Sequence, residues 1–232
     1  MSVLPATTSG DERRRGARVA VLPIGSFEQH GDHLPLATDT LVACAIAGRV
    51  AAAYDLLLLP PVTISCSHEH AGWPGTVSIS HTTLTAVVTD VLASLRRSGV
   101  DRLALVNGHG GNYVLANIVQ EANVGGPVMT LFPAREDWTA ARQAAGMGST
   151  GHDDMHAGEL EVSLLLHVNP AAVRPGAADH LGGDRRLLLV HGLGAYTGSG
   201  VIGLPTAGTA EKGRLLLDSL VAGFREHLDA LG

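Results

Sequence analysis

The chain has 232 residues, of which 45% are hydrophobic, so it can form one large domain or two small ones around a substantial core. Its net charge of −6 argues against a nucleic-acid partner, because phosphate binding requires a basic surface. No apolar run approaches the ~20 residues that span a bilayer, and two cysteines in a chain of this size are typical of free thiols in a reducing compartment. We therefore expect a cytoplasmic protein without a membrane partner.

The first 17 residues are polar and contain a basic run, Arg13-Arg14-Arg15. A polar terminal segment of this kind is typical of a solvated extension. We predict a disordered tail over residues 1–17, followed by a single domain over residues 18–232, because no linker or internal repeat divides the rest of the chain.

Apolar runs bounded by Gly, Pro and Asp then alternate with helical patterns. Strands are predicted at residues 19–24, 56–59 with 62–64, 75–79, 102–106 and 127–132. Helices are predicted at residues 38–53, 82–98, 112–122, 156–168 and 211–231, with residues 134–154 irregular or loosely helical and 170–200 a Pro/Gly-rich connector. Continuous apolar strands alternating with helices indicate an α/β fold: a single-domain α/β/α sandwich with a mostly parallel central sheet.

Polar clusters follow three of the predicted strands at the point where each strand ends. Glu28 and His30 follow the first strand, His70 follows the second, and His109 follows the strand at residues 102–106. Because ligands bind beyond the carboxyl ends of parallel strands, we expect these side chains to meet at one edge of the sheet.

The first cluster combines Glu28, His30 and Asp39 within a dozen residues. In an extended segment residues i and i+2 point the same way, so Glu28 and His30 can face one metal site, and carboxylates with imidazoles suit Zn or Mn. Asp39 has two interpretations, since a carboxylate at a helix start can cap the helix or bridge two metals.

The second cluster is the run Asn107-Gly-His-Gly-Gly-Asn112 between a strand and a helix. His109 is a candidate metal ligand there. The N–H groups of Gly110 and Gly111 can hold a developing oxyanion near the helix N-terminus. The alternative is a glycine turn with an incidental histidine.

The third cluster is His152-Asp-Asp-Met-His156-Ala-Gly-Glu159. His156 and Glu159 share a face if the helix begins at His156, so we predict Glu159 as a metal ligand and His156 as general acid or base. Glu161 is expected to point elsewhere on the helix. Asp153 is either a cap or a substrate contact.

The fourth cluster places His70 and Trp73 in the run Ser67-His-Glu-His-Ala-Gly-Trp-Pro-Gly-Thr76. Both suit a substrate pocket, because Trp offers an apolar face and one hydrogen-bond donor. A Trp packed on the surface is the alternative.

Four stretches together resemble the creatininase (creatinine amidohydrolase) family over about residues 19 to 230. They are Leu22-Pro-Ile-Gly-Ser-Phe-Glu-Gln-His-Gly-Asp-His-Leu-Pro-Leu-Ala-Thr-Asp39, Gly75-Thr76, Asn107-Gly-His-Gly-Gly-Asn112 and His156-Ala-Gly-Glu-Leu-Glu-Val-Ser163. The resemblance implies an α/β/α sandwich, a two-metal centre and a homohexamer built from dimers. It also implies metal ligation by Glu28, His30, Asp39 and His109, with Asp39 bridging, and a catalytic-region histidine at His156.

Two positions depart from the pattern of creatininase itself. At the position of the His109 turn, creatininase itself has a sequence similar to Gly-His-Tyr-Glu, in which the Glu binds a metal. This chain has Gly111 at the corresponding position, so we assign the fifth ligand to Glu159. The acid that precedes the catalytic-region histidine is Met155 here, which argues against creatinine as the substrate.

The function that we expect is a creatininase-like amidohydrolase that cleaves a C–N amide bond with two divalent ions of Zn, Mn or Fe. The substrate is a cyclic amide, a formamide or a small peptide. The late stretch Gly200-Val-Ile-Gly203 with Pro205-Thr206 is similar to the mycofactocin precursor-peptide peptidase branch, which makes that peptidase activity one alternative. A non-catalytic scaffold that kept the fold is the other.

Overall fold

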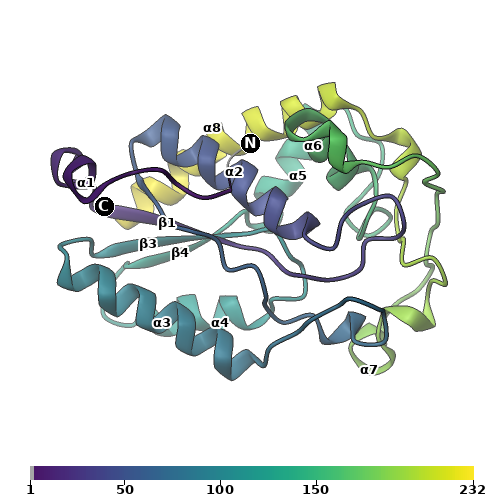
Figure 1. Cartoon of the computed structure of the whole chain (residues 1–232), viewed down its shortest axis with the longest axis horizontal. Coiled ribbons are helices and arrows are strands. Elements are labelled where there is room, and N and C mark those ends of the chain that lie inside the picture. The colour runs from purple at the N-terminus through teal and green to yellow at the C-terminus, as the bar shows by residue number, and fades with distance from the viewer. Residues whose placement is uncertain (1–2) are drawn as a thin grey trace.

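The computed structural model describes residues 3–232, and its centre is a four-stranded parallel sheet in the order β2-β1-β3-β4 (Figure 1). The strands are β1 (Val19–Ile24), β2 (Leu57–Leu58), β3 (Arg102–Asn107) and β4 (Met129–Phe132). β1 and β3 pair along their whole length, and every residue of β1 is buried. Strands that are buried on both faces need continuous apolar runs, which is the pattern that predicted a parallel sheet.

Helices cover both faces of the sheet. α2 (Thr38–Tyr54), α5 (Arg135–Ala144), α6 (Glu159–Val168) and α8 (Ala210–Leu231) lie on one face, and α3 (His81–Arg97) and α4 (Val114–Ala122) lie on the other (Figure 1). Successive β1 residues point to opposite faces, so Val19 and Val21 join the core under α2 and α8, whereas Ala20 and Leu22 join the core over α3 and α4. The α/β/α sandwich is confirmed.

Two predicted strand segments contribute only single bridges to the sheet. Val62 pairs with Ile24, and Val77 pairs with Phe27, without forming a ladder. Pro60 and Pro61 lack N–H donors, so the second strand cannot continue through them. Residues 134–154, which were predicted to be irregular or loosely helical, contain the regular helix α5. The Pro/Gly-rich connector at residues 170–200 contains the short helix α7 (Leu188–His191) and 3-10 turns.

The N-terminal segment differs from the disordered tail that was predicted for residues 1–17. The structure forms a helix, α1 (Ser9–Arg15), whereas residues 1 and 2 lie outside the described part of the chain. Thr8 and Asp11 form a reciprocal capping box at its start, and Arg15 contacts Asp55 at 3.0 Å. Among residues 3–232, no helix has the length and apolar character needed to cross a bilayer.

Two glycines let the start of α2 press against the ends of β1 and β3. A Cβ atom at Gly25 would overlap with Thr40, and one at Gly108 would overlap with the carbonyl oxygen of Asp39 and lie 3.0 Å from Ala43 N. Any side chain at these positions would push the helix away from the sheet. The close approach brings Asp39 to the edge where the loops after both strands begin.

We expect the Cys44 thiol to be unreactive in the folded protein. Cys44 is buried in α2, and burial raises the pKa of its thiol to about 11. A shift of this size lowers the thiolate fraction at pH 8 by about 100-fold relative to an exposed cysteine. Iodoacetamide labelling followed by mass spectrometry should therefore modify Cys44 at least 100-fold more slowly in the native than in the urea-unfolded protein; equal rates would contradict its burial.

Candidate metal centre

Four segments bring acidic and imidazole side chains together at the carboxyl edge of the sheet. Glu28 and His30 lie in the loop after β1, Asp39 in the first turn of α2, His109 in the loop after β3, and His156 just before α6. All five side chains are buried. The structure therefore brings together the residues that the strand-end argument placed at one edge.

Asp39 lies between two of these imidazoles. Its Oδ1 is 3.2 Å from His30 Nε2, and its Oδ2 is 3.2 Å from His109 Nδ1. Burial by itself would raise the carboxyl pKa of Asp39. The two histidines lower it by a larger amount, so the pKa falls well below its usual range. Because each oxygen faces a different imidazole, the carboxylate has the arrangement of a bridge between two sites.

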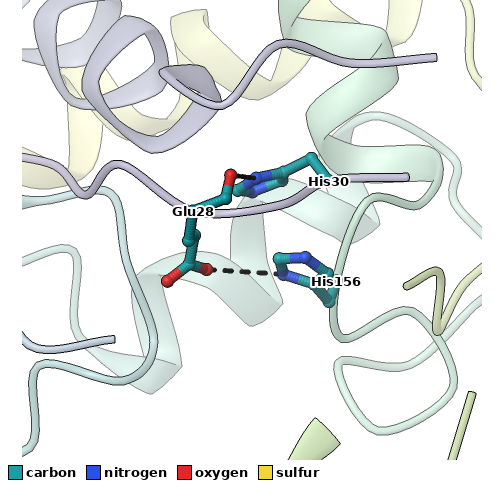
Figure 2. A group of neighbouring side chains, drawn as sticks. All are labelled: Glu28, His30 and His156. Carbon is teal, nitrogen blue, oxygen red and sulfur yellow. Dashed lines mark hydrogen bonds and ion pairs between the residues drawn. The ribbon is translucent and has the colours of Figure 1, made fainter. Parts of the chain in front are cut away.

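One oxygen of the Glu28 carboxylate accepts a hydrogen bond, and the other does not. Oε2 accepts a hydrogen bond from Ser26 Oγ at 3.1 Å. Oε1 is buried and has no hydrogen-bond partner among residues 3–232, although His70 Nε2 and His109 Nδ1 lie 3.2 Å away. Figure 2 shows the same oxygen directed at His156, whose Nδ1 is 3.8 Å from it. Asp39 Oδ2 is likewise buried without a partner.

Three imidazoles in this cluster donate from their outer nitrogen to a main-chain carbonyl. The pairs are His30 Nδ1 to Glu28 O at 3.1 Å (Figure 2), His109 Nε2 to Cys66 O at 2.8 Å, and His156 Nε2 to Gln29 O at 2.7 Å. A carbonyl oxygen can only accept, so the outer nitrogen carries the hydrogen. In the neutral ring the inner nitrogen then directs a lone pair at the buried carboxylates, which is how histidines that bind metals are oriented.

The electrostatics divide the histidines into two groups. Burial acts to lower the pKa of His30 and His109, but facing carboxylates raise both well above the ordinary value. Burial lowers the pKa of His156, and it lowers that of His70 to about 2, aided by neighbouring histidines. Buried carboxylates need balancing positive charge, so the centre is built to hold protons or cations beside Glu28 and Asp39.

Glu159, the predicted fifth ligand, lies outside this cluster. Its Oε1 accepts from Lys212 Nζ at 2.5 Å, and its Oε2 accepts from Ser149 Oγ at 2.6 Å. Glu161 lies in the cluster instead, with Oε1 at 3.7 Å from His30 Nε2 and Oε2 accepting from the N–H of Ala157. We therefore correct the assignment and take Glu161 as the candidate ligand.

Glu159 lies outside the cluster because of the position at which α6 begins. The helix starts at Glu159, and His156 instead pairs with Ile202 in an isolated bridge, so His156 and Glu159 do not share a helical face. Asp154 fixes this start, because its carboxylate accepts from the N–H groups of Glu159 and Leu160. The sequence shows the spacing between His156 and Glu161. This spacing indicates which acid of α6 faces the centre only once the start of the helix is known.

Gln29 was not predicted, yet it contacts two of the histidines. Its Nε2 lies 3.0 Å from His70 Nδ1 and 3.1 Å from His156 Nε2, and donates to Gly200 O at 3.1 Å. Gln29 Nε2 can donate to His70 Nδ1, whereas His156 Nε2 already donates to the Gln29 carbonyl. His70, predicted as a pocket residue, is buried in the centre itself.

Three groups of side chains have geometry suited to a metal ion. Their ligand atoms lie within 4.8 Å of one another, and the groups are Glu28 with Asp39 and His109, His30 with Asp39 and Glu161, and Glu28 with His30 and His156. The first two share Asp39. Mixed oxygen and nitrogen donors of this kind suit Zn, Mn or Fe.

Two cavities of about 770 Å³ each border the centre. The Trp73 cavity is lined by Glu69, Trp73, Gly111 and the α7 segment, and the His156 cavity by His109, Gly110, His156 and Glu161. The predicted pocket residue Trp73 and both turn glycines thus face cavities next to the centre. The N–H groups of Gly110 and Gly111 donate no hydrogen bond to any residue in the range 3–232.

Asp153 does not line either cavity. Its Oδ2 accepts from the N–H and hydroxyl of Thr150, which closes a turn at the rim of the His156 cavity. Of the two interpretations, the structure favours the cap over the substrate contact.

Comparison with known proteins identifies the family. Residues 6–228 match the family model Creatininase, described as creatinine amidohydrolase. The chain is 33% identical over 225 residues to a protein of Mycolicibacterium smegmatis named mycofactocin precursor peptide peptidase, which covers 90% of this chain and 84% of that protein. It is 32% identical over 174 residues to creatinine amidohydrolase of Pseudomonas putida, which covers 68% of this chain and 67% of that protein.

Solved structures agree with the sequence comparison. A structure titled Creatininase Mn aligns with a TM-score of 0.84 at 27% identity and covers 98% of both chains. A mutant creatininase of Zn-Zn type aligns with a TM-score of 0.81 at 26% identity, covering 98% of this chain and 97% of the other. The chain belongs to the creatininase family of amidohydrolases.

We expect Lys212→Met to destabilise the protein by about 2 kcal/mol, because it leaves the Glu159 carboxylate buried without its cation. The cost lies below that of a fully buried pair because Lys212 is 26% exposed. The double variant Lys212→Met/Glu159→Gln should recover more than half of the loss. Urea unfolding measures both; an unchanged midpoint for Lys212→Met would contradict the structural role of this pair.

Proposed function

We propose that this creatininase-family hydrolase is a two-metal amidohydrolase that cleaves a peptide C–N bond. The observation that carries the proposal is the pair of buried, unpartnered oxygens, Glu28 Oε1 and Asp39 Oδ2, which face the inner nitrogens of His109 and His156. Buried carboxylate oxygens normally have donors, so these atoms fit cation ligands better than a hydrogen-bond network.

We assign the ligands of each ion from the donor sets. Glu28, Asp39 and His109 would hold one ion, and His30, Asp39 and Glu161 the other, with Asp39 shared by its two oxygens. The Mn and Zn-Zn titles of the related creatininase structures support the same choice of metals. When bound, divalent ions lower the pKa of a coordinated water and polarise a substrate carbonyl.

His156 is the residue that we assign to proton transfer. Its Nε2–H is held by the Gln29 carbonyl, so Nδ1 is the nitrogen that faces the centre. Burial lowers its pKa, which keeps the ring neutral and able to accept a proton at Nδ1 from the attacking water. The imidazolium that results can pass this proton to the leaving nitrogen of the amide.

Gly110 and Gly111 are assigned to the carbonyl oxygen of the substrate. Their N–H groups have no partner among residues 3–232, and Gly111 lines the Trp73 cavity while Gly110 lines the His156 cavity. Free N–H donors at this position can stabilise the negative charge that develops on the oxygen during attack.

A peptide fits the space around the centre better than a small cyclic amide. The two cavities of about 770 Å³ that border the centre leave room for a peptide chain. Relatives named mycofactocin precursor peptide peptidase are 33% identical over 90% of this chain and 36% identical over 87%. We therefore propose a precursor peptide as the substrate class, with Trp73 packing against one part of it.

We expect two divalent ions per chain in the purified protein, measured by inductively coupled plasma mass spectrometry. Glu161→Gln should lose about one ion, because it removes a charged ligand of one site. Glu159→Gln is the matched control on the same helix and should keep both, since its carboxylate contacts Lys212. Loss of metal in Glu159→Gln but not in Glu161→Gln would overturn the assignment, and an ion-free wild type would favour a scaffold.

We expect the metal-loaded enzyme to cleave a mycofactocin precursor peptide and to leave creatinine intact, as followed by liquid chromatography and mass spectrometry. His156→Ala should lower kcat by about 100-fold or more while it retains both ions, because it removes only the proton carrier. Cleavage at the wild-type rate by His156→Ala would exclude this role. Hydrolysis of creatinine but not of the peptide would refute the substrate class.

A further inference from the structure

The carboxylate of Glu69 lies at the boundary between the Trp73 cavity and the candidate metal centre. Glu69 belongs to the 3-10 helix η1 (His68–His70), and its side chain is 13% exposed. Its Oε1 is 3.6 Å from His109 Nε2. No other residue in the range 3–232 donates a hydrogen bond to this carboxylate, so a largely buried charge faces His109 without a cation of its own.

Gly111 provides the space that this carboxylate occupies. A Cβ atom at position 111 would lie 2.8 Å from Glu69 Cδ and would overlap with both Glu69 Oε1 and His109 Nε2. Positions 69 and 111 therefore compete for one volume beside His109. The pattern of creatininase itself has an acidic residue at the position of Gly111, whereas here that position is glycine and an acid reaches the same place from η1.

We propose that Glu69 is a positioning residue that holds a carboxylate behind His109 in the space that Gly111 leaves open, and that Glu69 and Gly111 function as a pair. The proposal rests on the two-metal function proposed above. Glu69 acts through His109, whose Nε2–H lies between the Cys66 carbonyl at 2.8 Å and Glu69 Oε1 at 3.6 Å. Negative charge behind the ring favours this tautomer and strengthens Nδ1 as a ligand.

The main-chain carbonyl alone would orient His109, since it makes the shorter contact. What the carboxylate adds is charge, because a carbonyl dipole polarises the ring less than an anion does. The expected consequence is tighter metal binding rather than a different fold. Removal of such outer partners typically weakens metal affinity by about 10- to 100-fold.

The first experiment measures metal affinity in Glu69→Gln and Glu69→Ala by titration of the apoprotein with Zn²⁺ against a chromophoric competitor. We expect at least one site to weaken by about 10-fold or more in both variants. The thermal unfolding midpoint of each apoprotein should match the wild type, which separates charge loss from structural damage. Glu121→Gln, on the exposed part of α4, is the control for removal of one negative charge and should change nothing.

The second experiment tests the pairing with Gly111→Ala in the wild-type and Glu69→Ala backgrounds. Gly111→Ala crowds both the Glu69 carboxylate and His109 Nε2 and should weaken Zn²⁺ binding. Where Glu69 is already absent only the contact with His109 remains, so the effect should be smaller there. Affinity within twofold of the wild type in Glu69→Gln, or strictly multiplicative losses in the double variant, would overturn the proposal. A wild-type protein that binds no Zn²⁺ would instead refute the proposed function.

Discussion

The buried Asp39 carboxylate is the interaction on which the arrangement of the centre depends. Its two oxygens face His30 and His109, which come from loops after different strands, so one side chain joins the ends of β1 and β3. Asp39 reaches that place because α2 approaches the strand ends at Gly25 and Gly108, where no Cβ could be accommodated. A larger residue at either glycine would separate the acid from its histidines, and the centre would lose its shared ligand.

The histidines are fixed by main-chain carbonyls rather than by side chains. His30, His109 and His156 each donate outward to a carbonyl, which leaves the inner nitrogens to face Glu28 and Asp39. This arrangement makes ring orientation a property of the loop backbone, so most substitutions of neighbouring side chains should leave it intact. It also explains why two carboxylate oxygens remain without donors in a buried site: in the neutral rings of His109 and His156 the inner nitrogens present lone pairs, and a proton or a metal cation between nitrogen and oxygen satisfies both.

The sequence predicted the sheet, both helical layers and the strand-end cluster, because buried parallel strands and their following loops leave strong local patterns. It did not predict which acid of α6 enters the centre, since that choice depends on where the helix begins, and Asp154 sets the start through the N–H groups of Glu159 and Leu160. The capping box of Thr8 and Asp11 was present in sequence and would have predicted α1. Gln29 and Glu69 could not be found without the contacts between loops distant in the chain.

Glu159 and Glu161 show how the same helix serves two separate purposes. Glu159 is held by Lys212 of α8 and Ser149, so its charge is satisfied within the protein and ties the start of α6 to the neighbouring helix. Glu161, two residues later, keeps one oxygen on the Ala157 N–H and presents the other to His30. Glu159 thus anchors α6 to α8, and Glu161 faces the centre with its Oε1. Helix α8 therefore helps to position a candidate ligand that it does not contact.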